Sequence, residues 1–375
     1  MKEALLIVAD SERDANMLYA VSMFVPDPFI YLNLGGRPLI VMSDLEIDRA
    51  RRQAPHCRVL SLSAYQRKLR ATGSKRTGFP QIIRQLLREK KIRRVLVPEN
   101  FPLGLARDLK KLGLKLKPRA GIFPKREIKS ADEVKKISAA LAMAEVGMAE
   151  GMEVLRRAKI ARDRKLIYHG VPLNAERLRA VIDCAILQAN GLAANTIVAG
   201  GKQGCDPHER GHGPLRAHEP IIIDIFPRSQ KTGYFGDITR TVVRGHASEG
   251  VRKLHATVLQ GQKIAFEKIR AKVKAAEVHK AVQQFFVRQG YKTGRRNGRM
   301  EGFFHGTGHG LGLEIHEAPR VSATSSEILR AGHIVTVEPG LYYPELAGGV
   351  RLEDVALVTA NGAHNLTRFE KVLEI

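Results

Sequence analysis

The second half of this 375-residue chain carries four carboxylates and one histidine in settings that suit metal binding. The residues are Asp224, Asp237, His309, Glu338 and Glu353. Each lies within or beside a β-branched or glycine-rich run, where the backbone is extended or can approach a ligand closely. Four negative charges and one neutral nitrogen would balance two divalent cations and leave positions for water and substrate. The pattern therefore predicts a hydrolytic site with two metal ions.

Each of these residues has an ordinary structural explanation when it is taken alone. Asp224 follows Ile221 to Ile223, and a single aspartate at the end of a strand is most often a turn residue. In a buried position the same carboxylate is costly unless it is paired or bound to a metal. A lone histidine such as His309 is also more often structural than functional. Four such acids, together with a glycine-flanked histidine, favour the metal site over chance.

Two other motifs compete with this interpretation. His208 and His212 fit the H-E-x-x-H signature of zinc proteases, which requires one helix to present both side chains. Pro214 and the glycines before it would end such a helix, so this interpretation is not favoured. The glycines around His309 could also form a phosphate loop, but no Gly-Lys-Ser or Gly-Lys-Thr follows them.

Length and composition indicate a globular protein of two domains. The chain is 44% hydrophobic and 6% aromatic, and 375 residues exceed what one hydrophobic core usually serves. Its three cysteines are far apart and odd in number, which indicates reduced thiols in a cytoplasmic protein rather than a disulfide framework. The apolar run that begins at Ala4 is too short for a signal peptide, and no run is long enough to cross a membrane.

The formal net charge is +24, and the excess of basic residues is concentrated in the first third of the chain. Between Arg51 and Glu127 there are 22 Lys and Arg against four acids. Such a balance can indicate binding to nucleic acid or to an anionic surface. The basic runs lack the interleaved aromatic residues that would stack bases, so specific nucleic-acid binding is not expected. A solvated basic surface is the preferred interpretation, and steering of acidic substrates or weak adsorption of nucleic acid stays open.

The elements that would position these side chains divide near residue 128. Before it, strand-like runs alternate with basic helical segments such as 79–91, which indicates an α/β domain spanning residues 1–127. The strand-like runs are 4–9, 29–34, 39–42, 59–62 and 94–97. Gly35 and Gly36, between two of these runs, predict a hairpin turn.

A second domain is predicted over residues 128–375. It opens with a capping box at Ser130 and Glu133, followed by apolar residues at helical spacing. Further helices are predicted at 175–189, 250–271 and 275–289, and strands at 221–225, 238–243, 334–337 and 355–359. All four carboxylates fall inside these strands or at their ends. A sheet that carries the site, with helices covering its back, is the simplest architecture, and the repeated order of helices then strands would suit two related halves.

Several segments resemble the metal-binding signature of the M24 metallopeptidases, the pita-bread family of Xaa-Pro aminopeptidases, prolidases and methionine aminopeptidases. These segments are DIFPRSQKTGYFGDITRT, HGTGHGLGLEIHE, VEPGLY and GVRLED. The stretches SERDANMLYA and PDPFIYL resemble the family's creatinase-type amino-terminal domain, which methionine aminopeptidases lack. The resemblance implies the Xaa-Pro branch and a mixed α/β fold. A creatinase-type α/β domain would precede a pita-bread catalytic domain, in which helices back a curved antiparallel sheet.

The resemblance also implies a role for each site residue. Asp224 would chelate one metal, Asp237 and Glu353 would bridge both, and His309 and Glu338 would bind the other. A water shared by the two metals would supply hydroxide, and Glu338 would be the general base that takes the proton and passes it to the leaving nitrogen. The other implied roles are His208 and His316 as donors to the substrate carbonyl or oxyanion, Thr239 as a hydrogen-bond partner of a carboxylate, and His305 and Arg351 as substrate contacts.

The implied function is hydrolysis of Xaa-Pro peptide bonds, by dipeptidase or aminopeptidase action on a small peptide with proline at its second position. Two divalent ions are the expected cofactors, with manganese or cobalt favoured over zinc or iron. A homodimer is also expected. The segment 226–236 between the two aspartates is two residues longer than is usual in the family, so substrate preference is expected to differ there. A hydrolase or lyase of small molecules on the same metal scaffold, and a non-catalytic binding protein, are the alternatives.

Overall fold

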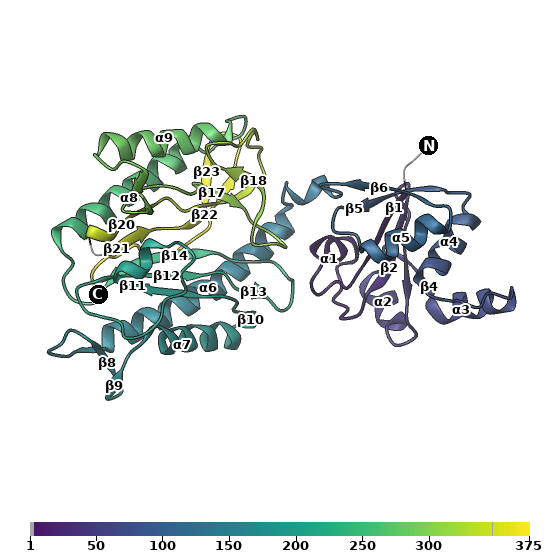
Figure 1. The fold of residues 1–375 in the computed structure, drawn as a ribbon, viewed down its shortest axis with the longest axis horizontal. Coiled ribbons are helices and arrows are strands. Elements are labelled where there is room, and N and C mark those ends of the chain that lie inside the picture. The colour runs from purple at the N-terminus through teal and green to yellow at the C-terminus, as the bar shows by residue number, and fades with distance from the viewer. Residues whose placement is uncertain (1–3, 347) are drawn as a thin grey trace. The chain divides into compact units, whose positions relative to one another are not determined.

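The computed structural model describes residues 4–346 and 348–375 and divides the chain into two compact units, Met1–Pro124 and Lys125–Ile375 (Figure 1). Both units combine helices with β-sheets, as the sequence predicts. Within the described residues, no helix has both the length and the apolar character that crossing a membrane requires.

The amino-terminal unit is built on one six-stranded sheet in the order β4-β3-β2-β1-β5-β6. Its strands are β1 (Ala4–Ala9), β2 (Phe29–Leu34), β3 (Pro38–Met42), β4 (Arg58–Ser61), β5 (Arg94–Pro98) and β6 (Lys115–Arg119). The neighbours β1 and β2, and likewise β2 and β3, are antiparallel, whereas the other neighbours pair in parallel. The predicted turn at Gly35 and Gly36 is confirmed, since their φ angles are 61° and 93°.

Helices cover both faces of this sheet, because strands bury their side chains alternately on the two sides. In β1, Leu6 and Val8 pack in one cluster with α3 (Leu62–Ala71), α4 (Phe79–Glu89) and α5 (Leu103–Lys111). Ile7, between them, belongs to the opposite cluster with α1 (Ala15–Val21) and α2 (Ile47–Gln53). The unit is therefore a three-layer α/β domain, and α4 is the basic helix predicted at 79–91.

Two pairs of helices cover the sheets of the second unit. The first pair is α6 (Ala131–Arg157) with α7 (Ala175–Gln188), and the second is α8 (Glu249–Lys268) with α9 (Ala275–Arg288) (Figure 1). The capping box predicted at Ser130 and Glu133 is present at the start of α6. Helices α6 and α7 approach closely at Gly147, where a Cβ would lie 2.7 Å from the Ile186 side chain. The predicted helix 250–271 ends earlier, because Ile269 leaves the helical conformation.

Two antiparallel sheets carry the strands predicted for the site. The first contains β11 (Ile197–Gly200), β12 (Pro220–Ile225) and β14 (Ile238–Val243). The second has the order β18-β17-β19-β22-β23, with β17 (Gly308–Gly310), β18 (Glu317–Val321), β19 (Ile334–Val337), β22 (Asp354–Val358) and β23 (Ala363–Asn365). A β-bridge between Thr239 and Glu353 joins the two sheets. The four predicted site strands are β12, β14, β19 and β22, each displaced by no more than one residue at either end.

Shorter strands surround this framework. They are β7 (Lys159–Ile160), β8 (Leu166–Tyr168), β9 (Val171–Pro172), β10 (Gly191–Leu192), β13 (Arg228–Ser229), β15 (Gly294–Arg296), β16 (Arg299–Glu301), β20 (Gly340–Tyr343) and β21 (Gly348–Arg351). The apolar core of the second half lies between α8, α9 and the second sheet, with Phe286 and Val335 among its buried residues. Helices thus cover the back of the sheets, as the sequence predicts.

Candidate metal centre

The five predicted metal ligands line one cavity of about 600 Å³ in the second unit. Asp224 is in β12, and Asp237 immediately precedes β14. His309 is in β17, Glu338 follows β19, and Glu353 precedes β22. Strand ends from both sheets therefore bring the five side chains to one place.

Glycines on both sides of His309 let β17 lie between two close neighbours. A Cβ at Gly308 would lie 1.9 Å from the Thr336 carbonyl oxygen in β19, and one at Gly310 would lie 2.2 Å from the Ala318 carbonyl oxygen in β18. The sequence suggests that these glycines admit a ligand. The structure shows instead that they admit the adjacent strands, which fixes the position of the histidine between them.

The His309 ring is neutral and presents a lone pair to two carboxylates. Its Nδ1 lies 3.1 Å from the Gly310 carbonyl oxygen, so Nδ1 carries the proton and donates it there. Its Nε2 lies 3.7 Å from Asp237 Oδ2 and 3.5 Å from Glu338 Oε1. Burial, followed by the neighbouring His316, lowers the pKa of His309 to about 3. A lone pair that faces carboxylate oxygens at these distances is stable only with a cation or proton between them.

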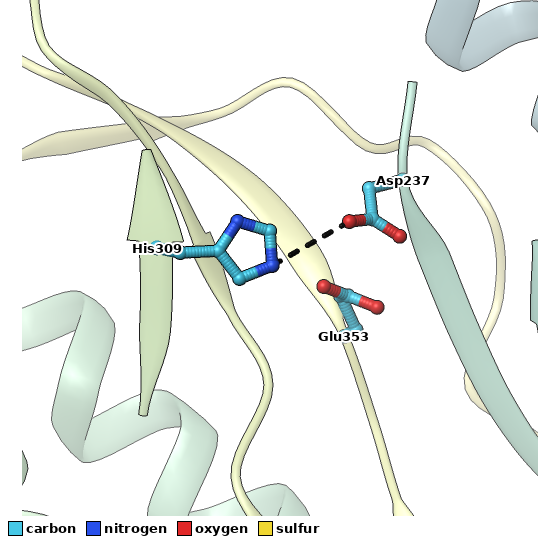
Figure 2. Close-up of side chains that lie close together, drawn as sticks. All are labelled: Asp237, His309 and Glu353. Atoms are coloured by element: carbon cyan, nitrogen blue, oxygen red, sulfur yellow. Dashed lines mark ion pairs between the residues drawn. The ribbon is translucent and has the colours of Figure 1, made fainter. Parts of the chain in front are cut away.

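Asp237, His309 and Glu353 point toward one another, with ligand atoms within 4.8 Å (Figure 2). The Thr239 hydroxyl donates a hydrogen bond of 2.7 Å to Oε2 of Glu353. Oε1 of Glu353 and Oδ1 of Asp224 are buried and have no hydrogen-bond partner within the described parts of the chain. Because buried oxygens without partners are costly, both atoms fit the ligands of a bound cation.

Burial and mutual repulsion raise the pKa values of three of these carboxyl groups. Burial, followed by Glu353 and Asp224, raises the pKa of Asp237 well above its ordinary value. Burial, followed by Glu338 and Asp224, raises the pKa of Glu353 in the same way. Burial raises the pKa of Glu338 to about 7. Carboxylates this close in a buried site ionise together only when cations compensate their charge, and carboxylate oxygens with one imidazole suit divalent ions.

A chain of hydrogen bonds connects Asp224 with His305. The Arg351 guanidinium donates from Nη2 to Asp224 Oδ2 at 2.7 Å and from Nη1 to the Tyr342 hydroxyl at 3.0 Å. The Tyr342 hydroxyl lies 2.8 Å from His305 Nε2, and His305 Nδ1 lies 2.7 Å from the Gly306 carbonyl oxygen. Nδ1 of His305 therefore donates to Gly306, and the Tyr342 hydroxyl donates to Nε2.

His305 and Arg351 line the cavity, but their polar atoms are engaged within the protein. This arrangement favours a role in holding Asp224 over the direct substrate contact that the resemblance implies. Tyr342, which joins the two residues, was not identified from the sequence. It lies in β20 as one of two adjacent tyrosines, and nothing in that run distinguishes it from a core residue.

His208 and His316 line the same cavity and are exposed. The His316 ring lies 4.4 Å from the His309 ring, centroid to centroid, at an interplanar angle of 88°. Both imidazoles can therefore meet a molecule in the cavity. Residues 206–214 form turns and extended chain, so no helix presents His208 and His212 together, and the zinc-protease interpretation is excluded.

A buried ion-pair cluster holds the loop that carries His316. Glu317 pairs with Lys129 at 2.8 Å and with Arg126 at 2.5 Å. The two cations come from the start of the second unit, more than 180 positions earlier in the chain. They therefore fix the backbone next to His316 without occupying the cavity.

Comparison with known proteins identifies the family. Residues 135–360 match metallopeptidase family M24. The chain belongs to this family. It is 32% identical over 296 residues to an Xaa-Pro dipeptidase from Pyrococcus horikoshii, with 74% of each chain covered.

Two solved structures show the same fold. An Xaa-Pro dipeptidase from Bacillus anthracis has a TM-score of 0.82 at 22% identity, covering 100% of this chain and 95% of that one. An X-Pro aminopeptidase from Thermotoga maritima has a TM-score of 0.81 at 21% identity, covering 99% and 97%. The predicted mixed α/β fold with a pita-bread catalytic domain is therefore confirmed. Proteins of family M24 are metallopeptidases, which agrees with the prediction of divalent metal ions.

A buried ion pair that was not recognised in the sequence lies next to the M24 centre and contacts the backbone of its residues. Arg240 and Asp354 are fully buried and lie 2.9 Å apart. Arg240 also donates to the carbonyl oxygens of Thr239 at 2.9 Å and Glu353 at 2.6 Å. Since Thr239 belongs to the first sheet and Glu353 adjoins the second, this guanidinium fixes the spacing of the sheets where their ligands meet.

The loop 226–236, between the two aspartates, contributes Phe226 to the cavity lining. The next residues form β13, which pairs with β10, and the Phe235 N–H donates to the Gly312 carbonyl oxygen at 2.9 Å. At Gly236 the chain passes against α6, where a Cβ would lie 2.5 Å from Ala140 backbone atoms. The loop is thus anchored on both sides. Phe226 is the residue of this loop that lines the cavity beside the proposed metal ligands.

Proposed function

We propose that this M24 protein is a metal-dependent peptidase that hydrolyses Xaa-Pro bonds in small peptides. The convergence of five ligand-type residues on one cavity carries this proposal. It occurs in a chain that is 32% identical to an Xaa-Pro dipeptidase over 74% of its length. Proline has no N–H and a fixed φ, so the bond before it has a distinctive shape that a cavity can select.

The ligand set suits two divalent cations, with manganese or cobalt favoured. Asp224 would chelate one ion, Asp237 and Glu353 would bridge both, and His309 and Glu338 would bind the other. The unpartnered oxygens of Asp224 and Glu353, and the lone pair of His309, support this assignment. Bound cations supply Lewis acidity, which polarises the scissile carbonyl and acidifies water.

The side chains around the ligands would orient the substrate and move the proton. Glu338 would accept the proton of the attacking water on its carboxylate and return it to the leaving nitrogen. His208 and His316, exposed at the cavity wall, would donate hydrogen bonds to the carbonyl oxygen as it gains charge. Arg351, through its ion pair, would hold Asp224 in its orientation.

Arg320 favours dipeptidase over aminopeptidase action. Arg320 and Arg351 are the two cationic side chains among the residues that line the cavity. Arg351 is committed to Asp224, whereas Arg320 forms no ion pair with any carboxylate in the described parts of the chain. A free guanidinium at the cavity suits the carboxylate of the proline that ends an Xaa-Pro dipeptide. In a longer peptide the proline is internal and has no free carboxylate.

The proposal is tested by cleavage assays on protein loaded with Mn²⁺. We expect Xaa-Pro dipeptides to be hydrolysed faster than Xaa-Pro-Xaa tripeptides, and Xaa-Ala dipeptides to be hydrolysed slowly. Equal rates on Xaa-Pro and Xaa-Ala would overturn the proline preference. Arg320→Gln should raise KM for Xaa-Pro about tenfold but leave the Xaa-Pro amide unchanged, because only the free acid uses the charge. Arg288→Gln, at an exposed position in α9, is the matched control.

A further inference from the structure

The basic residues of the amino-terminal unit gather on the helices that cover one face of its sheet. Fourteen Lys and Arg lie between residues 67 and 111, in α3, α4, α5, the loops next to them and the first position of β5, against three acids in the same range. All fourteen are exposed, and we call them the basic helical layer: Arg67, Lys68, Arg70, Lys75, Arg76, Arg84, Arg88, Lys90, Lys91, Arg93, Arg94, Arg107, Lys110 and Lys111.

The packing of the helices turns these charges outward. The buried residues of α3 and α5 are Leu69 and Leu109, and those of α4 are Ile82, Ile83, Leu86 and Leu87. These side chains form one cluster with the strands of the sheet. The opposite side of α4 carries Arg84 and Arg88, one helical turn apart. Apolar burial therefore fixes the direction in which the basic helical layer faces.

Most of these charges are not paired with a carboxylate within the described residues. Lys68 pairs with Glu89 at 2.5 Å and Arg107 pairs with Asp108 at 3.2 Å. The other twelve cations form no ion pair with a carboxylate in the described parts of the chain. Helix α6 of the second unit is different, since it contains five acids and four basic residues. The layer is therefore a field of one sign rather than a mixed, solvated surface.

We propose that the basic helical layer binds the phosphate backbone of nucleic acids without sequence preference. Each phosphate that it neutralises would release a condensed counterion, which is the main source of such binding. The aromatic residues of the region, Tyr65, Phe79 and Phe101, pack against the core and are not available to stack bases. Leu103 is the one large apolar side chain that residues 67–111 of the described chain expose, so an anionic membrane would find a single apolar anchor rather than an apolar face.

The experiment measures fluorescence anisotropy of labelled oligouridylate and of duplex DNA with the full chain over a range of salt concentrations. We expect the logarithm of affinity to fall against the logarithm of salt with a slope of about −2 or steeper, since each phosphate contact contributes about −0.7 to −0.9. Arg84→Glu, Arg88→Glu and Lys110→Glu together should weaken binding at least about tenfold at low salt and flatten the slope. A parallel assay uses phosphatidylserine-containing vesicles.

The matched control reverses the same number of charges on the helices of the second unit. Lys263→Glu, Lys280→Glu and Arg288→Glu change exposed residues of α8 and α9 and should leave the affinity within about twofold at about 0.1 M salt, because these residues are not among the proposed phosphate contacts and exposed charges are strongly screened at that ionic strength. Both triple variants should keep the peptidase activity and melting temperature of the parent. If the reversal to glutamate disturbs folding, Arg84→Gln, Arg88→Gln and Lys110→Gln give the same comparison.

Three results would overturn the proposal. One is equal weakening by the two triple variants, which would mean that net charge alone attracts nucleic acid. Another is the lack of salt-dependent binding to either nucleic acid at low ionic strength. The third is binding to the anionic vesicles but not to RNA or DNA. Peptidase activity does not enter any of these outcomes, so they are independent of the function proposed for the cavity.

Discussion

The two units of this protein place their polar groups in opposite ways. Within the described residues of the amino-terminal unit, Ser11 is the one polar side chain that is buried, and the charged groups lie at the surface. The second unit buries 20 polar or charged side chains within its described residues, among them Asp237, Arg240 and Glu353. Apolar burial stabilises a core by itself, whereas buried charge is costly unless another charge compensates it.

This difference shows where the second unit depends on something outside the chain. Arg240 compensates Asp354, and Arg351 compensates Asp224. The two proposed bridging carboxylates have no Lys or Arg within ion-pair distance among the described residues, and their pKa values are raised. Divalent cations are therefore part of the charge balance of the second unit, and the amino-terminal unit has no such requirement.

Substitution of Glu338 should have the largest of the predicted effects. The effect should be on the catalytic rate at the cavity of the second unit. Glu338→Ala removes both a proposed ligand and the proposed proton carrier, so we expect kcat to fall at least about a thousandfold. Elemental analysis would check the metal content of the variant. Glu277→Ala, an exposed acid in α9, is the control and should keep full activity. Unchanged turnover in Glu338→Ala would contradict the mechanism proposed for the cavity.

Removal of a buried cation should be far more damaging than removal of an exposed one. Arg240→Met removes the fully buried cation of Asp354 and leaves this carboxylate only its second ion pair, with Lys371 at 2.5 Å, so we expect a loss of about 3 kcal/mol in the free energy of unfolding, at the lower end of the range for a broken buried pair. Arg84→Met, at the surface of the amino-terminal unit, should change it by about 0.5 kcal/mol or less. Denaturant titration measures both. Equal losses would mean that the two units do not differ in how they hold charge.

The elements and the ligand types were predictable because they depend on local sequence. The runs that became β12, β14, β19 and β22 are rich in β-branched residues, and the box at Ser130 and Glu133 defines the start of α6. Each of the four proposed carboxylate ligands is within or adjacent to such a run, so its place near a strand end follows from the run itself. His309 lies instead in β17, a short glycine-flanked strand that the sequence did not predict. The structure adds that strand ends from both sheets meet at one cavity.

The groups that support the ligands were not predictable, because they depend on which strands become neighbours. Arg240 and Asp354 lie 114 positions apart in the chain, and each alone is an ordinary charged residue in a strand. Tyr342 is important only because it lies between Arg351 and His305 in the folded protein. Tertiary pairing of this kind leaves no periodicity or motif in the sequence.

Removal of divalent metal should destabilise the second unit alone. At a free metal concentration about 100 times the dissociation constant, bound ions contribute about 2.7 kcal/mol, and a chelator removes this contribution. Hydrogen exchange would locate the loss, with faster exchange expected in β12, β14 and β22 and unchanged exchange in β1 to β6. Faster exchange throughout the amino-terminal unit would show that its stability also depends on the metal. Mn²⁺ added back in excess of the chelator should restore the protection.

The smallest effect concerns the pH dependence of the metal-free protein. Burial raises the pKa of Glu338 from 4.5 to about 7, so the folded state holds this proton more tightly than the unfolded state does. Stability from this group is complete below about pH 4.5 and is lost as the pH rises through about 7. A glutamine at position 338 does not ionise, so Glu338→Gln does not lose this stability. In the presence of a chelator, the free energy of unfolding of the variant should therefore rise relative to that of the parent as the pH increases from about 4.5 to about 7. We expect a gain of about 1 to 2 kcal/mol near pH 7, because neighbouring carboxyl groups share the proton and reduce the effect of any one substitution. Arg84→Gln in the amino-terminal unit should show no such dependence, and a gain that shrinks as the pH rises would contradict the raised pKa.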